Sequence, residues 1–166
     1  MDHNMRRASV AITLPLLGLL ALALSAGLRP TDAASGPFDA LLGSWGGMGT
    51  YRMDDGRTEK VRCEAYYTGG GNQLSMVVRC ASAGNRIEIR SKLIASGGNL
   101  RGSWEERTYN AEGSASGQIT GDRLTLTVSG GISGAMTVTY SRSRQVVSIT
   151  TEGIPLKSVN ISLSPK

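Results

Sequence analysis

Histidine is almost missing from this sequence of 166 residues, whose one copy is His3. Because His3 lies in an N-terminal segment that we expect to be removed, the mature chain has none. This absence excludes Ser-His-Asp and Cys-His nucleophilic sites, histidine zinc sites and histidine-ligated haem. Glu105 and Glu106 are adjacent, so in a strand they point to opposite faces and cannot form an acid/base pair. We therefore expect no enzymatic activity, no catalytic residues, no metal site and no cofactor.

Aromatic residues are also few, at 5% of the chain, and Phe38 is the only phenylalanine. Without the N-terminal segment, 15 basic and 11 acidic residues leave a net charge of +4, with no Lys/Arg cluster. A dispersed charge of this size does not predict nucleic-acid binding. RIEIRSKLI, at 86–94, alternates apolar and charged residues, whereas an outer-membrane barrel needs a lipid-facing band and aromatic girdles. We expect no integral membrane domain after signal cleavage.

Residues 1–33 have the three-part layout of a secretory signal peptide. A polar start with an arginine pair precedes an apolar run over residues 8–26, and small residues follow. Cleavage before Ala34 fits this pattern, and cleavage near Ser25–Ala26 is the alternative. The apolar run is also long enough to remain as a membrane anchor. We expect cleavage and export, with a periplasmic or secreted location.

The remaining 133 residues are enough for one compact domain and too few for two. We divide them into a short N-terminal segment, 34–42, and a single β-barrel domain, 43–166. In the second part apolar residues recur at every second position, and Gly, Asn, Asp and Ser mark the breaks, which is typical of short strands joined by tight turns. Strands are predicted at 44–53, 58–68, 73–82, 86–94, 99–108, 113–120, 123–129, 133–142, 145–152 and 158–164.

These eight to ten strands predict an all-β fold, an antiparallel up-and-down meander. Because each connection is so short, every strand must pair with the next one along the chain. A meander of this length removes its exposed edges most simply by closing into a small barrel. A two-sheet β-sandwich of the same strands is the alternative.

A disulfide follows from the register of the second and third strands. A two-residue turn at Gly71-Asn72 places Cys63 directly opposite Cys80. The same register matches three further pairs by character: Ala65 with Val78, Tyr67 with Met76, and Glu64 with Arg79. We therefore predict a Cys63–Cys80 disulfide, as expected in an oxidising compartment. Two free thiols would be the alternative if the signal peptide were misread.

A carboxylate, Glu106, is predicted on the inner face. A turn at Gly97-Gly98 sets Arg90 opposite Glu105 on the outer face and Ser91 opposite Trp104 on the inner face, which carries Glu106 as well. A carboxylate among apolar residues is costly unless it is paired. Either the strand frays here and Glu106 is solvated, or Glu106 is a polar point in a binding cavity. In the second case its partner would be Arg142 or Arg144.

Two later hairpins complete the meander. A tight turn at Gly121-Asp122 sets Ile119 opposite Leu124. A turn at Ser143-Arg144 joins the next pair of strands, and its predicted partners are Met136 with Thr151, Val138 with Ile149, and Tyr140 with Val147.

The run Gly43-Ser44-Trp45-Gly46-Gly47-Met48-Gly49 resembles the G-x-W-x-G-x-G start of nitrobindin-like barrels and, more loosely, the G-x-W of lipocalins. Both belong to the calycin group of ligand-binding barrels. The haem ligand of nitrobindin-like proteins is a histidine, so the resemblance implies no haem here. The size, single disulfide and G-x-W start are also similar to small bacterial barrels that inhibit metalloproteases. Their inhibitory N-terminal trunk has no match beyond ASGPFDA, residues 34–40.

Together these features predict an exported, non-enzymatic β-barrel, a monomer that binds a small apolar ligand in its interior. The candidate ligand-binding residues are Trp45, Tyr67, Trp104 and Glu106. Small inward residues could leave room for a ligand near the two tryptophans: Gly47, Gly49, Ala65, Ser91, Gly102 and Gly117. The alternative is a packed barrel that acts on a protein partner, as a protease inhibitor or an envelope-associated protein.

Overall fold

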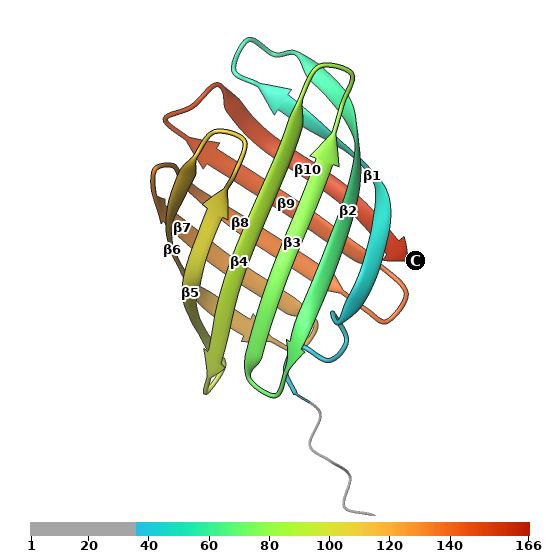
Figure 1. The fold of residues 1–166 in the computed structure, drawn as a ribbon, viewed down its shortest axis with the longest axis vertical. Helices are drawn as coiled ribbons and strands as arrows, with labels where there is room; N and C mark the ends of the chain where they lie inside the picture. The colour runs from blue at the N-terminus through green and yellow to red at the C-terminus, as the bar shows by residue number, and fades with distance from the viewer. Residues whose placement is uncertain (1–35) are drawn as a thin grey trace, which may run out of the picture. The chain divides into compact units, whose positions relative to one another are not determined.

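The computed structural model describes residues 36–166, which form a closed barrel of ten antiparallel strands (Figure 1). The strands are β1 (Gly43–Met53), β2 (Thr58–Gly70), β3 (Gln73–Ala81), β4 (Arg86–Ser96), β5 (Asn99–Glu106), β6 (Ala111–Thr120), β7 (Arg123–Gly130), β8 (Ser133–Tyr140), β9 (Gln145–Glu152) and β10 (Leu156–Pro165). Each strand pairs with the next, and β1 closes the barrel against β10. The barrel interpretation is therefore confirmed and the sandwich is excluded. The signal-peptide prediction falls outside the described residues.

Alternation of apolar and polar residues produces the two faces of the wall. In β10, Val159, Ile161 and Leu163 are buried inside, whereas Asn160 and Ser162 are exposed outside. Successive side chains of a strand point to opposite faces, so this pattern places one row in the core and the other in water. Between Gly36 and Lys166 the structure has no helix that is long and apolar enough to span a membrane.

Three of the predicted hairpin registers are confirmed, those of β2–β3, β4–β5 and β6–β7. The register predicted for β8–β9 is wrong by two residues, because Tyr140 pairs with Gln145 rather than with Val147. The turn centres on Arg142 and Ser143. The Ser141 N–H donates to the Arg144 carbonyl oxygen (2.8 Å), and the Ser141 hydroxyl accepts the Arg144 N–H (3.1 Å). Because the shift is an even number, every side chain keeps its predicted face.

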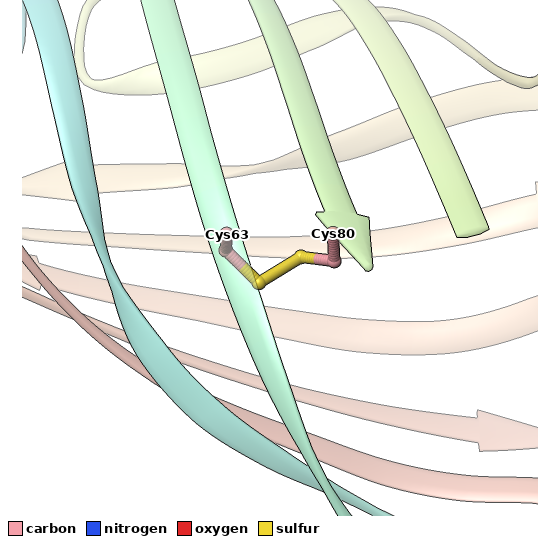
Figure 2. The surroundings of a disulfide bond; sticks show 2 residues. All are labelled: Cys63 and Cys80. Atoms are coloured by element: carbon pink, nitrogen blue, oxygen red, sulfur yellow. A yellow bond between two sulfur atoms is a disulfide. The ribbon is translucent and has the colours of Figure 1, made fainter. Parts of the chain in front are cut away.

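The predicted disulfide is present between Cys63 of β2 and Cys80 of β3, and the two Cα atoms are 4.1 Å apart (Figure 2). It joins directly paired positions of neighbouring strands. Because the chain has two cysteines in all, none remains free. A disulfide of this kind suggests a compartment other than the cytoplasm.

The glycines on the inner face allow the strands to bend. A Cβ atom at Gly102 would lie 1.8 Å from the Lys92 carbonyl oxygen, and one at Gly117 would lie 1.8 Å from that of Thr125. No side chain fits where a neighbouring backbone approaches so closely, and glycine kinks of this type curve strands into a barrel. The small size of these two residues is thus explained by backbone approach and does not by itself indicate a cavity.

Residues 36–42 close one end of the barrel. Phe38 and Leu41 are 0% and 1% exposed, and both belong to the core. The Trp45 indole N–H donates to the Leu41 carbonyl oxygen (2.8 Å), and the Tyr140 hydroxyl donates to that of Pro37 (3.3 Å). We call this the closed end; it also carries the turns β2–β3, β4–β5, β6–β7 and β8–β9. The opposite end, with the other five turns, is called the open end (Figure 1).

Candidate functional site

The four predicted ligand-binding residues all face the interior, but they divide between the two ends of the barrel. Trp45 and Tyr67 lie toward the closed end, where Trp45 holds the N-terminal segment. Trp104 and Glu106 lie toward the open end of β5. The structure therefore brings these residues together as two pairs and not as one site.

Tyr67 takes part in a buried polar contact that the sequence did not reveal. Its hydroxyl donates to Oε1 of Gln145 (3.0 Å), across β1 and β10, which separate β2 from β9. Gln145 is 0% exposed, and within residues 36–166 its Nε2 has no hydrogen-bond partner. Burial raises the pKa of the Tyr67 hydroxyl, so this group stays a neutral donor at physiological pH. The contact ties together strands at the closed end.

Trp104 lies across a neighbouring strand inside the barrel. Its indole N–H donates to the Ser129 carbonyl oxygen of β7 (3.2 Å), while its direct partner on β6 is Gly113. The absence of a side chain at Gly113 lets the indole pass over β6. Trp104 is 8% exposed, so its ring is almost fully covered inside the barrel.

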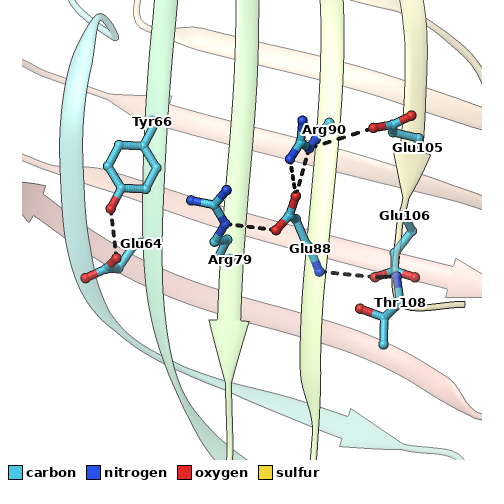
Figure 3. A network of polar contacts seen from close by, with 8 residues as sticks. All are labelled: Glu64, Tyr66, Arg79, Glu88, Arg90, Glu105, Glu106 and Thr108. Carbon is cyan, nitrogen blue, oxygen red and sulfur yellow. Dashed lines mark hydrogen bonds and ion pairs between the residues drawn. The ribbon is translucent and has the colours of Figure 1, made fainter.

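Glu106 is buried, and between Gly36 and Lys166 no arginine pairs with it. It is 5% exposed, and its carboxylate accepts three backbone N–H groups, of which Figure 3 shows that of Glu88. The donors are those of Glu88 (3.1 Å), Thr108 (3.1 Å) and Tyr109 (2.7 Å). The predicted solvated end is thus wrong, and so is the predicted partner, Arg142 or Arg144, because backbone N–H groups take its place. Three donors satisfy a buried carboxylate and fix the β5–β6 turn.

The outer face of the same strands carries a row of ion pairs (Figure 3). Glu88 of β4 pairs with Arg79 (2.9 Å) and with Arg90 (2.6 Å), and Arg90 lies 3.8 Å from Glu105. The hydrogen bonds from Arg79 and Arg90 lower the pKa of Glu88 to about 2. This row lies on the outer surface, where Glu88 and Arg90 are partly exposed, and its charges neutralise one another.

On β3, β4 and β7–β9, burial of the inner side chains falls from the closed end to the open end, whereas Tyr51, Val61 and Cys63 of β1 and β2 stay buried. Leu74, Leu100, Leu124 and Leu163, near the closed end, are at most 2% exposed. Toward the open end, six inward-facing apolar residues are only partly buried, and we call them the open-end lining: Val78, Ile87, Ile89, Val128, Met136 and Ile149. Met136 is the fourth of eight residues in β8, so solvent reaches well below the rim.

The open-end lining and Gln145 are the features that sequence reasoning missed. The alternation itself carried a signal for the lining, because it places apolar residues such as Ile87 and Ile149 on the inner face in the open half of β4 and β9. The contact between Gln145 and Tyr67 spans 78 residues of sequence and crosses the barrel, so no local pattern reports it.

Comparison with known proteins supports the fold. No family model and no curated protein matches the chain. Solved structures that resemble it include Rv2717c from M. tuberculosis, with a TM-score of 0.66 and 16% identity over 78% of this chain and 94% of that one. They also include the S-type phycobiliprotein lyase CPES from Guillardia theta, with a TM-score of 0.52 and 12% identity over 78% and 89%. These similarities are consistent with a calycin-like barrel and extend to the fold alone.

Proposed function

We propose that this protein is an exported, non-enzymatic carrier that binds a small apolar ligand in the open end of its barrel. The observation that carries the proposal is the open-end lining. Its side chains point inward, yet Met136 and Ile149, at the middle of their strands, are still partly accessible to solvent. When an apolar molecule covers an apolar inner surface that water reaches, the free energy falls, so binding is favoured.

Trp104 supplies a flat aromatic wall beside this surface. Among the four residues predicted from the sequence, it is the one that we retain as a ligand contact, because Trp45 and Tyr67 serve the closed end and Glu106 binds backbone. A ligand that contacts Trp104 and the open-end lining needs little polarity, since the inner face there offers mostly hydrocarbon.

The N-terminal segment favours this proposal over a protease inhibitor. An inhibitor that used residues 34–42 as a trunk would need them free to enter an active site. Instead, Phe38 and Leu41 are core residues, and the carbonyls of Pro37 and Leu41 accept hydrogen bonds from the barrel. Withdrawing Phe38 would expose a full aromatic side chain to water.

A binding role also suits the carboxylates of this region. Glu105 and Glu106 point to opposite faces of β5, and the Glu106 oxygens already accept three backbone N–H groups. Neither is free to act as an acid or base on a ligand inside the barrel. Export is supported by the disulfide together with the signal-peptide pattern of residues 1–33.

The first experiment is native mass spectrometry of the mature protein, purified from the exported fraction of its own host. We expect additional mass that denaturation removes, and fragmentation of the released species would identify its class. If the purified protein carries no ligand, it is titrated with an apolar fluorescent probe, N-phenyl-1-naphthylamine. The absence of saturable, one-to-one binding of this probe would overturn the proposal.

A pair of variants on β7 locates the site. Val128 faces the interior and Thr127 faces solvent. We expect Val128→Trp to weaken probe binding by about tenfold or more, because the new indole fills the space that a ligand needs. Thr127→Trp, with the same added side chain on the outer face, should leave the affinity unchanged. Equal affinities in the two folded variants would place the probe elsewhere.

A further inference from the structure

A groove of about 420 Å³ lies on the outer surface of the barrel wall, away from the ligand site proposed above. Strands β9, β10, β1 and β2 form it, and its lining includes Met48, Thr50, Lys60, Val146, Asn160 and Ser162. We call it the outer groove. Its shape follows from register, because Met48 pairs with Ser162, and Ser162 pairs with Val146. Two larger apolar side chains thus flank a small one in a single row.

The outer groove is unusually apolar for a face in contact with water. Met48 is 49% exposed and Val146 is 38% exposed. The alternation of β1 and β9 places both side chains outside, so neither contributes to the core. Between them lies space that one apolar side chain of a partner could occupy.

Unpaired cations border the outer groove. Lys60 lines it, Arg62 lies directly opposite Met48, and Arg52 follows on β1, two residues beyond Thr50. Between Gly36 and Lys166, none of these three cations forms an ion pair. On the outer face of β2 the nearest acid is Glu64, and it is already paired with Lys166 (2.5 Å). On β3–β5, by contrast, arginines and glutamates neutralise one another (Figure 3).

We propose that the outer groove docks an acidic peptide segment of another protein. One apolar side chain of that segment sits between Met48 and Val146, and its flanking carboxylates face Lys60, Arg62 and Arg52. The closed barrel offers no free strand edge within its ten strands, so recognition by added β-pairing is excluded and side chains must supply it. Charge complementarity of this kind sets specificity and speeds association.

The test begins with a random dodecapeptide library displayed on phage and selected on the mature protein. We expect the enriched peptides to carry Asp or Glu on both sides of a Leu, Met or Phe. The most enriched peptide is then synthesised, and its affinity is measured by fluorescence anisotropy. We expect Lys60→Glu and Met48→Asp each to weaken binding by about tenfold or more. Added salt should weaken it too, because exposed charges are screened.

Matched controls are available on β4. Lys92 is an exposed lysine, and Ile94 is an apolar side chain that is 53% exposed, both on the outer face but away from the groove. Lys92→Glu and Ile94→Asp should leave the affinity unchanged, and circular dichroism would verify that all four variants fold. The proposal is overturned if the enriched peptides lack acidic residues, or if the control and groove variants lose affinity equally.

Two other occupants of the groove would also overturn the proposal. Binding to phosphatidylglycerol vesicles that Lys60→Glu and Met48→Asp abolish, without any peptide binding, would identify a membrane surface. Self-association that Met48→Asp abolishes, measured by analytical ultracentrifugation, would identify a second copy of the chain. Neither result depends on whether the barrel interior binds a ligand.

Discussion

Glu106 shows how a single buried carboxylate can define the open end of the barrel. Its three backbone donors belong to the start of β4 and to the β5–β6 turn, so one side chain holds two parts of the rim together. Without it, each of these N–H groups loses the protein acceptor that the structure gives it. Buried donors left unpaired cost more free energy than the hydrogen bond itself contributes.

We therefore expect Glu106→Ala to lower the free energy of unfolding by about 3 kcal/mol. The adjacent variant Glu105→Ala removes an exposed carboxylate that lies 3.8 Å from Arg90, and it should change stability by less than about 0.5 kcal/mol. Urea unfolding followed by tryptophan fluorescence measures both. If Glu106→Ala and Glu105→Ala had equal free energies of unfolding, water would replace the carboxylate of Glu106, and this end of the barrel would already be hydrated.

At the scale of elements, the disulfide joins two strands that already share a hairpin. Cys63 and Cys80 are separated by 17 positions, so the cross-link restricts only a short loop of the unfolded chain. We expect Cys63→Ser/Cys80→Ser to lower the free energy of unfolding by about 3 kcal/mol on the chain-entropy account. Urea unfolding of this variant should match that of the reduced wild-type protein. If the urea midpoint of the variant and that of the reduced wild-type protein both equal the midpoint of the oxidised protein, the hairpin alone restricts the unfolded chain as strongly as the disulfide does.

The hairpins also show how far sequence reasoning reaches. Cys63–Cys80 and Arg90–Glu105 could be predicted because two-residue glycine turns fix the register, and side chains matched by charge and size then agree with it. The β8–β9 turn has no glycine, so a serine hydroxyl that caps its backbone decided the register instead. Such a cap is visible only when the turn is built, and the prediction was wrong there by two residues.

At the scale of the whole molecule, the sequence predicts which side chains point inward but not which of them meet. Trp45, Tyr67 and Trp104 all face the interior as predicted, yet their partners are Leu41, Gln145 and Ser129, none of them on a directly paired strand. The register of paired strands determines which residues are neighbours in the barrel wall, but not which side chains meet across the interior. The length of each side chain and the segment that fills one end decide how the interior is divided.

This division predicts unequal opening of the two ends. The closed end is filled by Phe38 and Leu41, whereas the open-end lining packs against fewer atoms. Strand ends with less packing open locally at a lower free energy cost. In hydrogen exchange followed by mass spectrometry, we expect peptides that cover 86–89 and 128–136 to exchange faster than those that cover 36–45.

Ligand binding should slow hydrogen exchange at one end of the barrel and not at the other. N-phenyl-1-naphthylamine bound at the open end stabilises the folded state and so slows exchange most where it packs. Peptides over 86–89 and 128–136 should be protected on addition of the probe, and those over 36–45 should not change. Protection confined to 36–45 would instead place the ligand beside Tyr67 and the unpaired amide of Gln145, at the end that the N-terminal segment closes.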